Sequence, residues 1–116
     1  IRWEDKLDVN CSWTIQNLKT KFPPLLLIPL IENAFKHVSR SSNVKGYINI
    51  LFEEKAETIS LEVENSKSAL PVEKEKNSGL GLENLRNRLD ILYGEKYRLI
   101  IQNSDNVYNS KLIILK

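Results

Sequence analysis

Three polar residues in this 116-residue chain have the types and spacing that could bind a metal and a phosphate. Asn33, Lys36 and His37 are spaced i, i+3 and i+4, which places them on one face of a helix. An amide oxygen such as that of Asn33 suits Mg²⁺, and a lysine can neutralise phosphate oxygens. Taken alone, Lys36 and His37 also fit a solvated helix end near the negative pole of the dipole, and His37 fits a residue hydrogen-bonded to its neighbours.

A Gly-x-Gly turn forms the second candidate group. Gly79, Leu80 and Gly81 open a helical pattern, where glycines allow close backbone approach and the free N–H groups of a helix start favour an anion. Arg86 follows on the same helix and could neutralise phosphate. Alone, the glycines also fit a tight turn, and Arg86 and Arg88 fit a solvated face, from which at least one could reach the lid or the phosphates. Together the two groups predict a phosphate site.

Two amphipathic helices must position these residues. In the first, Leu27, Ile31, Ala34, Phe35 and Val38 share the face opposite Asn33 and predict a core contact. Pro29 inside this pattern predicts a kink or a late helix start, because proline removes a backbone hydrogen bond. The second helix runs to residue 93 and stops at a C-cap glycine. Its apolar face is predicted to contain Leu82, Leu85, Leu89 and Leu92.

Alternating apolar and polar residues predict five strands around these helices. They cover residues 7–15, 47–53, 58–64, 97–102 and 107–115, and the first is expected to bury one face. The second and third form an antiparallel hairpin. The order predicts an α+β fold, a two-layer sandwich with a mixed, mostly antiparallel sheet and helices on one face. Residues 65–78 have little to bury and predict a lid or a disordered loop.

The composition excludes several classes of function. Seventeen basic and fifteen acidic residues give a net charge of +2, without the basic excess of a nucleic-acid surface. A single cysteine, Cys11, and a single histidine exclude an internal disulfide and a Cys/His zinc site, which fits a reducing cytoplasm. The longest apolar run, residues 23–31, is shorter than the ~20 residues of a membrane span. We expect one domain, residues 1–116.

Two long motifs give the chain a family resemblance. Residues 23–37 and 78–94 resemble the catalytic ATP-binding domain of the LytS/YehU class of sensor histidine kinases. These kinases belong to the gyrase–Hsp90–histidine kinase–MutL superfamily, which has the Bergerat fold. The resemblance implies that Asn33 holds Mg²⁺ and that Lys36 and His37 lie near the phosphates of ATP. It also places Gly79 and Gly81 in the second glycine box and makes residues 65–78 the ATP lid.

The chain departs from this pattern at two places. The first glycine box should fall at residues 64–68, where both glycines are missing and Glu64, followed by Asn65, would take the place of an adenine-binding aspartate. Where related ATPases have a water-activating glutamate, this chain has Pro29, which cannot act as a base. Phosphoryl transfer depends mainly on positioning and charge neutralisation, so the site suits transfer to a protein histidine rather than hydrolysis.

The resemblance also implies partners outside this chain. The phosphorylated histidine would lie on an upstream dimerisation helix, so this fragment alone is expected not to autophosphorylate. The parent protein would be a homodimer in the bacterial inner membrane that serves a response regulator, expected to be of the LytTR type. No nucleic-acid partner is expected. The missing glycines leave a second hypothesis open, a pseudokinase that signals by protein contact without nucleotide, and an ATP hydrolase is the third.

Overall fold

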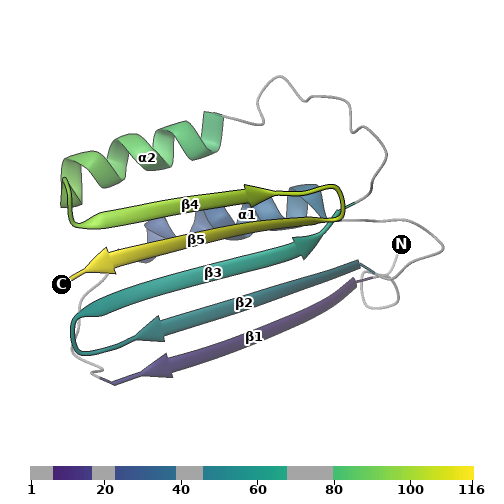
Figure 1. The fold of residues 1–116 in the computed structure, drawn as a ribbon, viewed down its shortest axis with the longest axis horizontal. Helices are drawn as coiled ribbons and strands as arrows, with labels where there is room; N and C mark the ends of the chain where they lie inside the picture. The colour runs from purple at the N-terminus through teal and green to yellow at the C-terminus, as the bar shows by residue number, and fades with distance from the viewer. Residues whose placement is uncertain (1–6, 17–22, 39–45, 68–79) are drawn as a thin grey trace.

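The computed structural model describes residues 7–16, 23–38, 46–67 and 80–116. Their secondary structure follows the predicted order of strands and helices (Figure 1). In chain order the elements are β1 (Leu7–Ile15), a short 3-10 helix (Pro24–Leu26), α1 (Ile28–His37), β2 (Gly46–Glu54), β3 (Thr58–Ser66), α2 (Leu80–Tyr93), β4 (Tyr97–Asn103) and β5 (Val107–Leu115). Neither helix in these ranges is long and apolar enough to cross a membrane.

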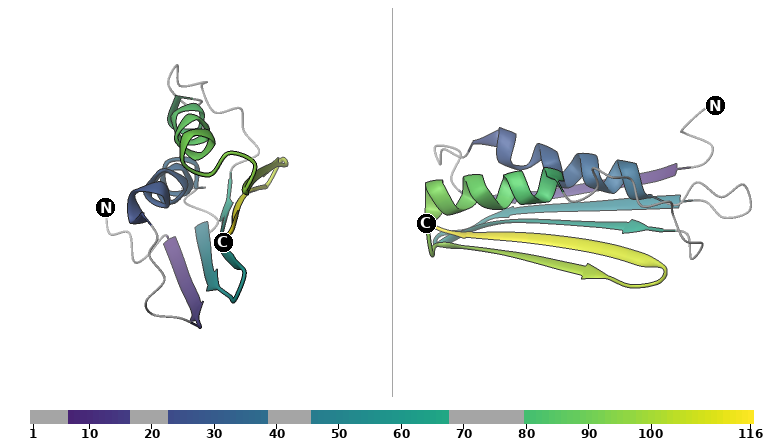
Figure 2. Two further views of the ribbon diagram at one scale, coloured as in Figure 1. Left: turned by 90° about the vertical axis from the view of Figure 1, so that its left-hand side faces the viewer. Right: turned by 90° about the horizontal axis from the view of Figure 1, so that it is seen from above.

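The five strands form one mixed sheet in the order β1-β2-β3-β5-β4. β1 and β2 are parallel, and the other neighbouring strands are antiparallel. Parallel neighbours need a crossover connection, and α1 lies in it. Both helices cover the same face of the sheet (Figure 2). The predicted α+β class and two-layer arrangement are therefore confirmed.

The core lies between the sheet and the two helices. Strand β3 supplies the three inward residues that its alternation predicts, and each helix supplies residues one turn apart. Burying one leucine-sized side chain contributes about 1.5–3 kcal/mol, so these contacts hold the helices on the sheet. Central core residues are Ile59, Leu61 and Val63 of β3, Leu30 and Ala34 of α1, Leu85 and Leu89 of α2, and Leu112 and Ile114 of β5.

Helix α1 starts late, as Pro29 predicts. The helix begins at Ile28, so Pro29 stands in the first turn, where its missing N–H has no intrahelical partner to lose. At the other end the chain becomes extended at Val38, whose N–H donates to the carbonyl of Ala34 at 2.9 Å. The position of the proline thus sets where α1 begins.

The buried face of α1 is centred on a residue that the predicted face omitted. Leu30 is completely buried and lies one turn before Ala34, which is also buried. Leu27, Ile31 and Phe35 pack against the core only partly. The centre of the apolar face is therefore rotated from the predicted one, and the polar face turns towards α2 with it.

The prediction that β1 buries one face is wrong. Only Leu7 is buried, whereas Val9, Ile15 and the ring of Trp13, which is 66% exposed, are accessible to solvent. β1 is an edge strand, whereas α1 packs over β2, β3 and β5 and α2 contacts β4 at the opposite edge of the sheet. Alternation shows which side chains share a face, but only the tertiary arrangement determines whether that face is covered.

The C-terminal end of α2 was predicted correctly except for Leu92. Gly94 has a φ of 56°, the left-handed conformation that favours glycine after a helix. Its N–H donates to the carbonyl of Asp90 at 3.0 Å. Leu92 is 56% exposed, because the buried register that passes through Leu89 continues four residues later at Tyr93.

Candidate functional site

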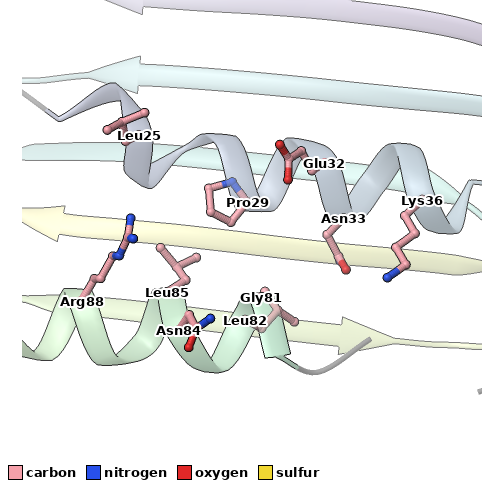
Figure 3. Close-up of a pocket in the computed structure, with 10 residues that line it drawn as sticks. All are labelled: Leu25, Pro29, Glu32, Asn33, Lys36, Gly81, Leu82, Asn84, Leu85 and Arg88. Carbon is pink, nitrogen blue, oxygen red and sulfur yellow. The ribbon is translucent and has the colours of Figure 1, made fainter. Parts of the chain in front are cut away.

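A cavity of about 290 Å³ lies between the polar face of α1 and the facing side of α2 (Figure 3). Its volume is near the lower end of the range of small-molecule pockets, about 300–1,000 Å³. Four lining residues of each helix are spaced i, i+3, i+4 and i+7 and form a continuous stripe along that helix, and α2 adds a fifth, Leu82. The lining residues are Pro29, Glu32, Asn33 and Lys36 of α1, Gly81, Asn84, Leu85 and Arg88 of α2, together with Leu25 and Leu82.

The structure brings Asn33, Lys36 and Gly81 together at this cavity, as the sequence predicts. In Figure 3 the side chains of Asn33 and Lys36 extend from α1 towards α2, and the visible tip of Asn33 is its oxygen. A Cβ atom built on Gly81 meets nothing within 4 Å, so the glycine leaves open space rather than relieving a clash. An amide oxygen, an ammonium group and exposed backbone therefore share one pocket.

Arg88, rather than Arg86, is the arginine that lines the cavity. The two residues are about 200° apart around the helix, so they cannot share a face. The positive charge of Arg86 lowers the phenol pKa of Tyr97, against a larger increase caused by the hydrogen bond to Asp90, and it also lowers the pKa of Tyr108. Arg88 lies seven residues after Gly81, a spacing that places both residues on one face of a helix. Residue type alone does not distinguish Arg88 from Arg86.

Gly79 and most of the predicted lid lie outside the described residues. Leu80 is the first residue of α2. The predicted lid boundary at residue 65 is wrong, because β3 continues through Asn65 to Ser66. Pairing with β5 accounts for the extension, since Asn65 and Ser66 remain in register with Tyr108 and Val107.

Glu64 does not reach the cavity. Residues 59, 61, 63 and 65 of β3 are buried beneath the helices, so Glu64 lies on the opposite face of the sheet. There its carboxylate accepts a hydrogen bond of 3.1 Å from the hydroxyl of Tyr47. Burial, and secondarily this carboxylate, raise the pKa of Tyr47. The structure therefore does not place Glu64 where a ligand between α1 and α2 would lie.

Asn65, the other predicted residue of this box, faces the helix layer and is completely buried. Its Nδ2 donates to the carbonyl of Ser66 at 2.9 Å. Its Oδ1 is buried and has no hydrogen-bond partner among the described residues. Asn65 does not line the cavity itself. An unpaired buried acceptor costs free energy, which makes Oδ1 a candidate for a ligand donor.

His37 is the last residue of α1, and its side chain packs against the sheet and does not line the cavity. Its ring stacks on Tyr108 of β5, with centroids 5.9 Å apart and an interplanar angle of 28°. This contact fits the alternative of packing against neighbours, and a position of His37 near the phosphates stays a prediction. The single histidine anchors the end of α1 to the sheet.

Tyr108 is a neighbour of two predicted site residues, although it does not line the cavity and was not identified from the sequence. It lies opposite Asn65 in the β3–β5 ladder and under His37 of α1. Burial raises its pKa, whereas the facing amide of Asn33 and the charge of Arg86 lower it. In β5 the side chains of residues 108, 110, 112 and 114 face the helices. A polar residue among these inward positions was the sequence feature that could have identified Tyr108.

The donor set around the cavity fits a magnesium ion that arrives with a phosphate ligand. No group of three or more His, Cys, Asp or Glu side chains that could hold a metal occurs in the described ranges. The cavity offers the amide oxygen of Asn33 and the carboxylate of Glu32. Mg²⁺ commonly takes one or two protein ligands and fills its octahedron with water and phosphate oxygens. These residues suit that arrangement.

Comparison with known proteins supports the sequence resemblance. The chain is 28% identical over 116 residues to the sensor protein LytS of Streptococcus mutans and 27% identical over 117 residues to LytS of Oceanobacillus iheyensis. Each alignment covers 90% of this chain, and the chain spans 20% of the length of each relative. No protein-family model matches the chain.

Solved structures share the fold. The catalytic domain of the histidine kinase ThkA superposes with a TM-score of 0.70 and 22% identity, covering 95% of this chain and 80% of that one. ThkA in complex with the response regulator TrrA gives a TM-score of 0.62 and 21% identity, covering 95% of this chain and 34% of that one. The fold is that of histidine kinase catalytic domains, and the predicted resemblance to the LytS class is confirmed.

Proposed function

From this similarity to LytS sensor proteins, we infer that the chain is the ATP-binding catalytic domain of a two-component sensor histidine kinase. The observation that carries the proposal is the pair of facing stripes on α1 and α2, which bring Asn33, Lys36 and Arg88 to one cavity. A metal-binding amide and two cations around a pocket suit a polyphosphate ligand. The proposed ligand is Mg·ATP.

Each cavity residue has a role in this proposal. Asn33 would hold Mg²⁺ through Oδ1, and the metal would neutralise the charge that develops on the phosphates during transfer. Lys36 and Arg88 approach from opposite helices, and both would bind phosphate oxygens. The ammonium group of Lys36 would act as a compact positive charge, and the guanidinium group of Arg88 could donate two parallel hydrogen bonds. Gly81 leaves space for the phosphates against the first turn of α2.

Asn65, rather than Glu64, is proposed to recognise adenine. Its buried Oδ1 lacks a donor among the described residues, and the exocyclic amino group of adenine is a donor. An amide oxygen accepts a weaker hydrogen bond than a carboxylate does. The proposal therefore retains an acceptor for adenine, although both glycines of this box are absent.

The reaction is proposed to be transfer rather than hydrolysis. Pro29 lines the cavity at the position where related hydrolases carry their base. Glu32 is the carboxylate that also lines it, which makes ATP hydrolysis the competing activity to test. In the proposed reaction the γ-phosphate passes to a histidine on an upstream dimerisation helix of the parent protein.

Further partners follow from the same proposal. The parent would be a homodimer in the bacterial inner membrane, with this domain on the cytoplasmic side. It would pass its phosphate to a response regulator of the LytTR type. The chain itself is expected to bind nucleotide without autophosphorylating, because His37 is its single histidine and packs on Tyr108.

Calorimetric titration with a non-hydrolysable ATP analogue and Mg²⁺ tests the proposal. We expect binding by the wild type and a loss of at least about tenfold in Asn33→Ala, which removes a ligand to a charged group. Asn87→Ala is the matched control, because Asn87 is exposed on α2 and does not line the cavity. A folded domain that gives no heat at millimolar nucleotide would support the pseudokinase hypothesis instead. Steady phosphate release above background would support the hydrolase.

A further inference from the structure

Strand β1 leaves one edge of the sheet unpaired in the described part of the chain (Figure 1). On its other side β1 pairs with β2, and just after β1 the N–H of Gln16 donates to the carbonyl of Glu54 at 3.3 Å. In a parallel ladder, residues whose N–H and C=O groups face the partner strand alternate with residues whose groups face away. Residues 8, 10, 12 and 14 therefore face β2, and residues 7, 9, 11, 13 and 15 turn these groups to the open edge.

The open edge of β1 lacks the features that usually protect an edge strand. Such strands are typically short, or carry a lysine, a proline or a bulge that prevents pairing with another chain. β1 has nine residues without lysine, proline or glycine, and its register with β2 is unbroken. The other edge strand, β4, contains Arg98 and contacts α2. β1 is therefore the edge at which a further strand can pair.

The residues that face the open edge also form an exposed apolar row. Side chains in register on parallel neighbours point to the same face of a sheet, and Val9 and Trp13 are in register with Ile48 and Phe52. Ile48 is completely buried in the core, so the row lies on the face that carries the helices. Val9, Trp13 and Ile15 are nevertheless exposed. Large apolar side chains beside an unpaired backbone edge are typical of an interaction surface.

We propose that β1 pairs with β1 of a second copy of this chain, antiparallel and centred on Cys11. Cys11 is the middle residue of β1, so this register pairs every residue of the strand and brings the outward-facing N–H and C=O groups together. Val9 then faces Trp13 of the second copy, an aromatic and β-branched pair of the kind that stabilises sheets. Asp8, the single charge of β1, faces Thr14 and does not meet its own copy.

The paired strands would join two sheets into one, with both helix layers on the same side. The α1–α2 cavity takes no part in the pairing, so the proposal does not depend on the proposed function and is tested without nucleotide. An interface built on one strand is smaller than the roughly 1,200–2,000 Å² of standard stable complexes. We therefore expect a reversible dimer with a dissociation constant in the micromolar range or above.

Substitution of Cys11 is the direct test, because this residue would face its own copy. Cys11→Lys places two like charges opposite each other, whereas Ser12→Lys places the same charge opposite Asn10. Sedimentation equilibrium in reducing buffer measures self-association. We expect Cys11→Lys to raise the dissociation constant of the dimer at least about tenfold and Ser12→Lys to raise it less than about threefold. Equal effects, or a wild type that stays monomeric at millimolar concentration, would overturn the proposal and leave this face to a different polypeptide.

Disulfide trapping tests the register independently. In a Cys11→Ser background, Asn10→Cys and Ser12→Cys are made as separate proteins and mixed with an oxidant. Directly opposed residues of a non-hydrogen-bonded pair have Cα atoms about 4.5 Å apart, within disulfide range, whereas diagonal neighbours are about 7–8 Å apart. The mixture should form heterodimers, and each protein alone should form at least about fivefold fewer disulfide dimers. Asn87→Cys, exposed on α2, controls for random collision, and equal trapping of this variant would overturn the proposal.

Discussion

Glu64 and Asn65 are consecutive residues of β3 that lie on opposite faces of the sheet. Asn65 is buried under the helices, and its Oδ1 has no hydrogen-bond partner in the described part of the chain, whereas Glu64 is hydrogen-bonded to Tyr47 on the other face. Successive side chains of a strand always diverge in this way, so a register shift of one residue exchanges their roles. The assignment of adenine recognition therefore depends on the register of β3.

Substitution of these two residues should have unequal effects on nucleotide affinity. Asn65→Ala removes the proposed acceptor, and we expect ATP-analogue affinity to fall by roughly two- to tenfold, the value of a neutral hydrogen bond. Glu64→Ala should leave it unchanged. Calorimetry with adenine and guanine nucleotides measures both. An effect of Asn65→Ala that is equal for the two bases would contradict a contact with the adenine amino group.

The two arginines of α2 provide a second test of the cavity. Arg88→Ala removes a cation from the pocket lining and should weaken triphosphate binding by at least about tenfold, because hydrogen bonds to charged groups contribute about 1.5–3 kcal/mol. Arg86→Ala is the control of identical chemistry on another face of α2. Binding of AMP should change little in either variant. A larger effect of Arg86→Ala would place the phosphates elsewhere.

Gly81→Ala should move stability and binding in opposite directions. The new methyl group meets no protein atom within 4 Å, and alanine is favoured over glycine in a helix by roughly 0.5–1 kcal/mol at interior positions, so a smaller gain in stability is expected at Gly81 in the first turn of α2. The same methyl group enters the cavity, so nucleotide affinity should fall.

Urea unfolding and calorimetry measure the two effects of Gly81→Ala. Gly94→Ala is the counterpart outside the pocket, because its φ of 56° makes alanine strained and should lower stability by about 1 kcal/mol. Reduced stability in Gly81→Ala would show that the open space at this residue is filled in the folded protein.

An ion pair between Glu54 and Lys116 joins residue 116 to the sheet. Glu54 is 3% exposed and accepts from Lys116 Nζ and, at 2.6 Å, from the N–H of Gln16. The side chain of Lys116 is 24% exposed, so Glu54→Ala leaves no buried unpaired charge, and the loss of these hydrogen bonds to a charged group should destabilise the domain by about 1.5–3 kcal/mol. The exposed pair of Glu53 and Lys55, 3.5 Å apart, is the control, and Glu53→Ala should cost less than about 1 kcal/mol. Urea unfolding measures both, and similar losses would contradict this account.

Local sequence patterns predicted the elements of this fold better than the contacts between them. Alternation in residues 58–64 and the glycine after α2 depend on neighbouring residues, and both predictions are confirmed. The exposure of β1 and the burial of Leu30 depend on where the helices lie, which periodicity does not specify. Periodicity also could not decide between Leu92 and Tyr93, because either residue could continue the apolar stripe from Leu89, and only Tyr93 packs against the core.

The residues of the candidate site were predicted where they depend on a motif within one helix, and not where they depend on contacts between elements. Asn33, Lys36 and Gly81 were found because each belongs to a motif within one helix. Tyr108 was missed because its importance depends on a contact between β5 and α1, which are distant in the sequence. The sequence left Arg86 and Arg88 open and favoured Arg86, because the rotation of α2, which decides which arginine faces α1, depends on tertiary contacts.

The position of β5 has a consequence for biosynthesis. This strand follows the others in the chain, yet it lies between β3 and β4, and it carries Tyr108 to the residues of α1 and β3. A nascent chain on the ribosome can therefore pair β1, β2 and β3, but it cannot complete the five-stranded sheet until β5 has emerged, since β4 has no partner before then. Truncated translation products that end before residue 107 should be unable to sequester ATP, however much of α1 and α2 they contain.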